Sequence, residues 1–158
     1  MRVEDLTAGQ VMSRVLVVVE PEESVLMAWE LMRRACVHHL PVSRRGRLLG
    51  VLTREDVAAA WQGGPDAQSR YQVKSLVAGR RTPHVQPSDP MSKVAAAMLD
   101  AQADAVPVMA DSRIVGLITT TDLLEAIAGR TSPREEHGEI VTGMFRIEPV
   151  IPSMVTGT

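Results

Sequence analysis

Two stretches of this chain place an aspartate three residues after a threonine. They run Gly-Val-Leu-Thr-Arg-Glu-Asp over residues 50–56 and Gly-Leu-Ile-Thr-Thr-Thr-Asp over residues 116–122. In each, we expect the threonine at the start of a helix, directly after an apolar strand that contains a glycine. The first N–H groups of a helix lack partners within the helix and attract anions such as phosphate. A carboxylate one turn later can accept hydrogen bonds from both hydroxyls of a ribose, so the motif suits a nucleotide.

The same Thr-x-x-Asp pattern is also a capping box, whose two side chains only satisfy the first turn of their own helix. One such motif is more often a cap than a ligand site, and its repetition is what favours the ligand interpretation. The motif offers no base that would activate the threonine hydroxyl. The chain also has no Walker sequence, no Gly-x-Gly-x-x-Gly and no nucleophile elbow. We therefore expect no catalytic residues and no enzymatic activity.

Both motifs belong to a longer internal repeat with an offset of 66 residues (119 − 53), without insertion or deletion. The sequence His-Leu-Pro-Val at 39–42 returns as Ala-Val-Pro-Val at 105–108. Identical residues recur at this offset in the pairs Val19 and Val85, Pro21 and Pro87, Met32 and Met98, Arg47 and Arg113, Gly50 and Gly116, Thr53 and Thr119, and Asp56 and Asp122. Two such units can bury each other's apolar faces, and clefts between packed units commonly bind small molecules.

Each half is predicted to form strand, helix, strand, strand and helix, which gives an α+β fold of two β-α-β-β-α repeats packed with pseudo-twofold symmetry. In the first half we expect strands at 16–19, 37–42 and 48–52, and helices that begin at Ser24 and Thr53. In the second half we expect a strand at Val85, a helix at about 89–100, strands at 105–109 and 114–118, and a helix at 119–128. The predicted domains are repeat 1 at 1–62, a flexible linker at 63–73, repeat 2 at 74–129 and a C-terminal tail at 130–158.

The C-terminal tail lies outside the repeat. Its residues 140–147 alternate between apolar and polar side chains roughly as a strand does. Chain ends are commonly disordered, yet Phe145 is the only phenylalanine of the chain. Two alternatives therefore stay open: the tail docks on the body or on a partner, or it is disordered.

The composition narrows the class of protein. Apolar residues make up 45% of the chain and aromatic residues 3%, which indicates a core of aliphatic side chains and methionine. A net charge of −2 gives no reason to expect a nucleic-acid partner. The sequence shows no signal peptide and no apolar stretch long enough to span a membrane, and its single cysteine excludes an intrachain disulfide. We expect a cytoplasmic protein, and the arginine-rich composition indicates a GC-rich bacterial genome.

The order of these features, with an apolar-Pro-Val strand, a turn and Gly-x-x-Thr-x-x-Asp in duplicate, resembles a tandem pair of CBS domains (the cystathionine-β-synthase domain) over about residues 8–128. The Val-Met-Ser at 11–13 matches the family's usual start. The resemblance implies a stand-alone pair that forms a disc-shaped homodimer and binds an adenosine-containing ligand in the clefts between the repeats. AMP, ADP or ATP is the expected ligand, S-adenosylmethionine and NAD are further candidates, and no cofactor is required. Ligand binding would be relayed by a conformational change to the homodimer or to an unidentified effector protein.

The resemblance also implies two clefts, each formed by both repeats. The first cleft is expected to contain Ser13, Arg14, Val37, His38, His39, Leu117, Thr119 and Asp122. The second cleft is expected to contain Gly79, Arg80, Ala103, Asp104, Ala105, Val51, Thr53 and Asp56. Asp104 stands where the first cleft has His38 and should repel a phosphate, although Arg80 and Arg81 could offset it. We therefore expect the first cleft to be the better nucleotide site, so that loss of Asp122 removes most of the binding and loss of Asp56 little.

Other interpretations compete with this one. The chain could be a protein-interaction or dimerisation module with vestigial clefts, which would bind no adenosine ligand. An enzyme or a metal-binding stress protein is a further alternative. A metal site at Cys36, His38 and His39 lacks a second group of ligands, so we expect no metal and expect Cys36 to be a small buried apolar residue.

The larger apolar side chains are expected to pack rather than to bind a cofactor. We expect Trp29 and Trp61 to face the core or the dimer surface. The resemblance implies that helices form the dimer interface, with Met27, Met32 and Leu99 as contributors.

Overall fold

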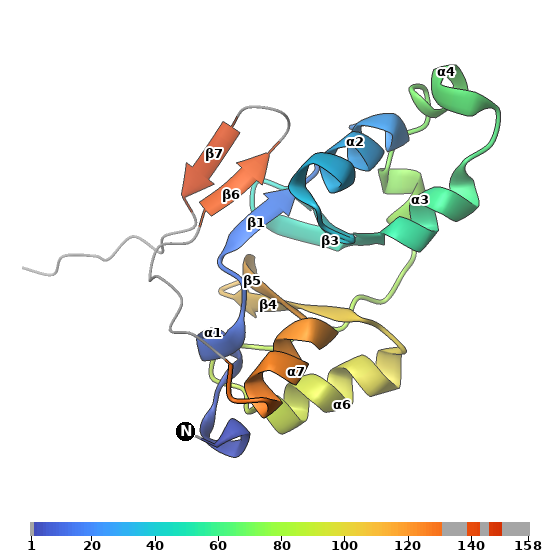
Figure 1. Cartoon of the computed structure of the whole chain (residues 1–158). Helices are drawn as coiled ribbons and strands as arrows, with labels where there is room; N and C mark the ends of the chain where they lie inside the picture. The colour runs from blue at the N-terminus through green and yellow to red at the C-terminus, as the bar shows by residue number, and fades with distance from the viewer. Residues whose placement is uncertain (1, 131–138, 143–145, 150–158) are drawn as a thin grey trace, which may run out of the picture.

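The computed structural model describes residues 2–130, 139–142 and 146–149, and Figure 1 shows two halves stacked on each other. The first half contains β1 (Val15–Val18), α2 (Val25–Ala35), β2 (His39–Arg44), β3 (Arg47–Thr53) and α3 (Arg54–Ala60). The second half contains α6 (Met91–Ala101), β4 (Ala105–Ala110), β5 (Arg113–Thr119) and α7 (Thr120–Ile127). This is the mixed α+β architecture that the sequence predicts, with the first strand of the second half reduced to a single parallel bridge between Val85 and Val108.

The two halves repeat each other in backbone detail. In the antiparallel pair β2–β3, His39 lies opposite Thr53, and in β4–β5, Ala105 lies opposite Thr119. Each pair has a register shift at its fourth residue, between residues 42 and 43 and between residues 108 and 109. The matching bulges twist both hairpins in the same way. The end of each hairpin that leads into α3 or α7 is therefore placed equivalently in the two halves.

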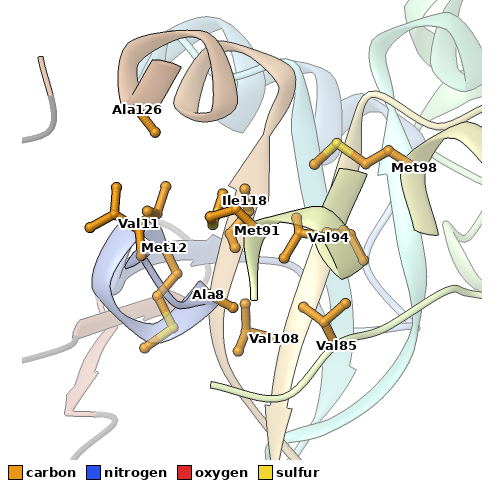
Figure 2. Close-up of a cluster of buried hydrophobic side chains, with 12 residues drawn as sticks. Ala8, Val11, Met12, Val85, Met91, Val94, Met98, Val108, Ile118 and Ala126 are labelled. Atoms are coloured by element: carbon orange, nitrogen blue, oxygen red, sulfur yellow. The ribbon is translucent and has the colours of Figure 1, made fainter. Parts of the chain in front are cut away.

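The core of each half is completed by a short helix that lies just before the other half in the chain. We call these two helices the exchanged helices. The helices α1 (Ala8–Val11) and α5 (Lys74–Val77) are equivalent by the repeat offset, since 74 − 8 = 66. Figure 2 shows Ala8, Val11 and Met12 packed against Val108 and Ile118 of the second half. In the first half, Val73 and Val77 pack in the same cluster as Leu40 and Leu52. The two cores are thus interlocked, although each repeat is continuous in sequence.

Backbone hydrogen bonds hold both exchanged helices in place. The N–H of Ala8 donates to the carbonyl of Asp89 at 2.8 Å, and the N–H of Lys74 donates to the carbonyl of Pro21 at 3.1 Å. Gly50 of β3 lies against Val77, and Gly116 of β5 lies against Met12. The glycine of each Gly-x-x-Thr-x-x-Asp motif is therefore explained by the close approach of the exchanged helix.

The segment expected to be a flexible linker is partly helical. Here α4 (Gly64–Gln68) begins with Pro65 in its first turn, which suits proline because the missing N–H is not needed there. Gln68 is fully buried, and its Nε2 donates to the carbonyls of Ala60 at 3.3 Å and Gln62 at 2.6 Å. These hydrogen bonds attach α4 to the first half. The glycine and proline residues of this segment therefore did not by themselves indicate a flexible linker.

Two short strands of the tail extend the first half. The strand β6 (Glu139–Thr142) pairs in parallel with β1, and β7 (Arg146–Pro149) pairs antiparallel with β6. The tail therefore docks on the body of the protein through backbone pairing, with Leu16 opposite Ile140. Phe145, whose docking was left open, lies outside the described residues.

In the part of the chain that is described, no helix has the length and apolar character needed to cross a membrane.

The close approach at Gly50 leads to a prediction about stability. A Cβ at Gly50 would lie 2.8 Å from the Cβ of Val77, so the substitution Gly50→Ala forces β3 and α5 apart. We expect the free energy of unfolding to fall by about 1–3 kcal/mol, as for other overpacked cores, measured by urea denaturation. The double variant Gly50→Ala with Val77→Gly should lose clearly less than the sum of the two single losses, since glycine removes the Cβ that the new methyl group would meet. Additive losses would show that the contact does not limit the packing.

Candidate functional site

Both Thr-x-x-Asp motifs form capping boxes at the starts of α3 and α7. The N–H of Thr53 donates to Asp56 Oδ2 at 2.8 Å, and the N–H of Asp56 donates to Thr53 Oγ1 at 3.1 Å. The equivalent distances at Thr119 and Asp122 are 2.8 and 3.4 Å. The caps are real, and both threonines also line cavities between the halves. The capping and ligand interpretations therefore do not exclude each other.

The first cleft contains a cavity of about 220 Å³. Five of its eight expected residues line this cavity, namely Ser13, Val37, His39, Leu117 and Thr119. The remaining three, Arg14, His38 and Asp122, do not line it. Ser13 and Leu117 join the two repeats by paired backbone hydrogen bonds of 2.9 and 3.1 Å.

The second cleft contains a cavity of about 430 Å³. Six of its expected residues line it, namely Val51, Thr53, Arg80, Ala103, Asp104 and Ala105. Gly79 and Asp56 do not line it, but Asp56 is bound to Arg80, which does. The cavity is also lined by His39, Glu55 and Thr82, which were not expected in this cleft from the sequence. Their positions depend on how the two halves pack, and no local pattern in the sequence marks them.

The strongest electrostatic contact of the second cleft is a two-pronged ion pair between Arg80 and Asp56. Arg80 Nη1 donates to Asp56 Oδ2 at 2.8 Å, and Nη2 donates to Oδ1 at 2.7 Å. The side chain of Asp56 is 16% exposed and that of Arg80 is 44% exposed. Burial by itself raises the pKa of Asp56, but the hydrogen bonds from Arg80 and from Thr53 outweigh it and hold this pKa below its ordinary value. The carboxyl group of Asp56 is therefore ionised at neutral pH, and both of its oxygens are occupied by the guanidinium.

His39 lies between the two clefts and lines both cavities. Its burial lowers the pKa below the ordinary value of a histidine, and the charges of Asp104 and Glu55 only partly offset this effect. At neutral pH His39 is thus an uncharged imidazole that can donate or accept a hydrogen bond. His38 is exposed and lies outside both cavities.

The expectation that Cys36 is buried is wrong. Cys36 is exposed, because it ends α2 in the left-handed conformation with φ of 53°. It lines the first cleft beside Val37. Within the described residues, no three histidine, cysteine, aspartate or glutamate side chains gather in a way that could hold a metal ion.

Comparison with known proteins identifies the repeated unit. A family model described as CBS domain matches the chain twice, at residues 8–63 and 73–129. Inosine-5'-monophosphate dehydrogenase from Korarchaeum cryptofilum (strain OPF8) is 28% identical over 131 residues, which is 82% of this chain and 26% of that enzyme. The chain therefore spans about a quarter of the length of this relative.

Two solved structures share the fold. The CBS domain pair of protein MJ0100, in complex with 5'-methylthioadenosine and S-adenosyl-L-methionine, superposes with a TM-score of 0.68 at 24% identity, covering 78% of this chain and 97% of that chain. Hypoxic Response Protein I, with two coordinated zinc ions, superposes with a TM-score of 0.65 at 24% identity, covering 75% of this chain and 97% of that chain. At this level of identity, the two likenesses establish the fold alone.

The ion pair at Asp56 predicts a pH dependence of stability. A carboxyl whose pKa is lower in the folded protein than its unfolded value of about 3.9 stabilises the fold above that pH and stops doing so as the pH falls through the folded pKa. We expect the free energy of unfolding to fall between about pH 5 and pH 3, and to fall less steeply in Arg80→Gln. Urea denaturation at several pH values measures this. Arg81→Gln is the matched control, since Arg81 lines the same cavity, and an equal change in both variants would contradict the assignment.

Proposed function

The chain belongs to the CBS-domain family, with two CBS domains in tandem, and we propose that it is a non-catalytic regulatory module that binds an adenosine nucleotide between them. The observation that carries the proposal is the second cleft, where the cap of α3 and residues of both halves surround one cavity. The pair from protein MJ0100 supports it, since that pair was solved with two adenosine-containing ligands. The match to inosine-5'-monophosphate dehydrogenase overlaps the two CBS matches and covers 26% of that enzyme, so it supports shared CBS domains and not shared chemistry.

The relative sizes of the two clefts favour the second one as the nucleotide site. Small-molecule sites measure about 300–1,000 Å³, and the cavities here are about 430 Å³ in the second cleft and 220 Å³ in the first. From the sequence, the negative charge of Asp104 in the second cleft favoured the first cleft as the nucleotide site. Asp104 is exposed, and repulsion between charges about 4 Å apart in water is only about 1 kcal/mol. Arg80 and Arg81 line the same cavity and oppose this repulsion. The difference in cavity volume therefore outweighs the charge of Asp104, and we propose the second cleft as the nucleotide site.

The ion pair of Arg80 with Asp56 suggests how a nucleotide enters. The two hydroxyls of a ribose can replace the guanidinium on the two oxygens of Asp56. Arg80 is then available to pair with a phosphate, and its planar group suits that role. Because adenosine without a phosphate breaks the same ion pair and gives Arg80 no new anion, the exchange favours AMP, ADP or ATP over uncharged adenosine compounds.

A route for the signal leads from the same residue. Arg80 follows α5 closely in the chain, and its N–H donates to the carbonyl of Val77 at 3.3 Å. Val77 packs in the core of the first half against β3. Movement of Arg80 from Asp56 to a phosphate therefore pulls on the helix that joins the two halves. A ligand shifts such an equilibrium only through a difference in its affinity for the two arrangements.

Exposed apolar side chains on α6 and α7 support the proposal of a homodimer. Leu99, Leu124 and Ile127 are 78%, 61% and 67% exposed. The corresponding positions of the first half hold Arg33, Ala58 and Trp61. The three side chains form an apolar face on the second half, which a second copy related by a twofold axis would cover. Met32 cannot contribute to this interface as expected, because it is 1% exposed within the core of the first half.

Nucleotide binding is tested by isothermal titration of the full chain with AMP, ADP, ATP, adenosine, S-adenosylmethionine, NAD and GTP. We expect an adenosine nucleotide to bind, and Asp56→Asn to weaken it at least tenfold. Asp122→Asn is the matched control, since it alters the equivalent capping box of the other repeat. If Asp122→Asn abolishes binding and Asp56→Asn does not, the first cleft is the site. If no adenosine compound binds, the clefts are vestigial and the interaction-module alternative holds.

The same titration with Arg80→Gln tests the exchange of partners at Asp56. We expect the preference for AMP over adenosine to shrink at least tenfold, because the variant loses the phosphate contact and no longer blocks the ribose position. An unchanged preference would show that Arg80 does not contact the phosphate.

The homodimer is tested by size-exclusion chromatography with light-scattering detection, which gives the molar mass of the protein at several concentrations. We expect a dimer for the natural sequence and a monomer for Leu99→Glu, which places a charge on the apolar face. Leu49→Glu is the control, since Leu49 is 41% exposed on a different element. A natural chain that stays monomeric at every concentration would rule the interface out.

A further inference from the structure

A further cavity lies at the turns of the two hairpins. It measures about 860 Å³ and is lined by Arg45, Arg47, Thr82, Asp111 and Arg113, among others. These turns are at the opposite ends of the hairpins from Thr53 and Thr119. Thr82 also borders the second cleft, so the two cavities lie along one extended segment. The capping boxes take no part in this cavity.

The walls of this turn cavity are positively charged. Three arginines face one carboxylate, that of Asp111, which leaves two positive charges (3 − 1). Within residues 2–130, Arg45, Arg47 and Arg113 form no ion pair, whereas the neighbouring Arg44 pairs with Glu22. Like charges gathered around one cavity repel each other unless an anion lies between them.

The backbone holds the two turns together. The N–H of Ile114 donates to the carbonyl of Gly46 at 3.2 Å, which links one hairpin turn to the other. Both turns have two consecutive residues with positive φ, 52° and 80° at Arg45 and Gly46, and 50° and 65° at Asp111 and Ser112. Such tight turns fix the direction in which the flanking strands leave. The arginines therefore project from a rigid frame.

Arg47 and Arg113 are equivalent residues of the two repeats, since 113 − 47 = 66. They line the same cavity, so it lies where the two halves meet around their pseudo-twofold axis. A Cβ at Gly46 would lie 3.5 Å from Cγ of Arg113, which shows how closely this arginine passes the opposite turn. Two arginines that line one cavity from opposite halves can together bind an anion with several oxygen atoms.

We propose that the turn cavity binds an organic phosphate with at least two negative charges. The guanidinium groups supply paired donors for the phosphate oxygens, and the hydroxyls of Thr82 and Ser112 supply further donors. Leu48 and Met109 form an apolar wall for the organic part of the ligand. The volume falls within the range of small-molecule sites. Two sources share this chemistry: a free phosphorylated metabolite, and the phosphates of a nucleotide whose adenosine lies in the second cleft.

The test is titration of the full chain with sodium tripolyphosphate, which has no adenosine, at constant ionic strength. We expect one site per chain, and the double variant Arg47→Gln with Arg113→Gln to weaken it at least tenfold. The double variant Arg2→Gln with Arg70→Gln is the matched control, since it removes the same charge from exposed positions elsewhere. An equal loss in both would mean general charge attraction and would overturn the proposal, as would the absence of binding to the natural chain.

Backbone amide spectra of the natural chain give a readout that needs no variant. Tripolyphosphate should shift the signals of residues 45–48 and 111–114, and shifts confined to residues 80–83 and 101–105 would overturn the proposal. Shifts at residues 45–48 and 111–114 that leave the signals of residues 101–105 unchanged separate this site from the proposed nucleotide cleft. Saturation with AMP distinguishes the sources: undiminished tripolyphosphate binding indicates a free metabolite, and competition indicates nucleotide phosphates that reach into the turn cavity.

Discussion

The exchange of opening helices between the halves is the contact on which the rest of the structure depends. Because α1 packs in the core of the second half and α5 in that of the first, neither core is complete without the other half. The exchange holds the two halves against each other, and the clefts lie between them. It also explains why a glycine recurs in β3 and β5: each strand must leave room for the helix that arrives from the other half.

The same arrangement couples the ligand sites to the frame of the molecule. Arg80 lies just after α5, and Ser13 lies just after α1. Each cleft is therefore lined in part by a residue that directly follows one of the helices that join the halves. In the second cleft, the ion pair between Arg80 and Asp56 links the segment after α5 to the start of α3, although the two residues are 24 positions apart in sequence. A group that replaces Arg80 on Asp56 acts on the joint between the halves and not on a surface loop.

The elements built from local patterns were predictable from the sequence, and those set by long-range packing were not. Alternating apolar residues, the repeat and the threonine caps placed the hairpins and the helices α2, α3, α6 and α7. The helix α4 was missed, because Gly63, Gly64 and Pro65 were interpreted as a flexible connection, and the burial of Gln68 that anchors it depends on tertiary contacts. Cys36 was expected in the core, but the left-handed turn at the end of α2 exposes it. The role of Arg80 could not be inferred locally, since its partner lies in the other repeat.

The exchanged helices also have a consequence for how such a chain could arise. A single 66-residue unit of this kind would lack the helix that closes its core, and only a second copy could supply it. Two separate copies would pay the entropy of association each time, whereas a tandem chain presents the second copy at a high effective concentration. In a tandem chain the two halves need not stay identical, because equivalent residues of the two repeats have different neighbours. His38 and Asp104, at equivalent positions, show how far two such halves can diverge within one closed pair.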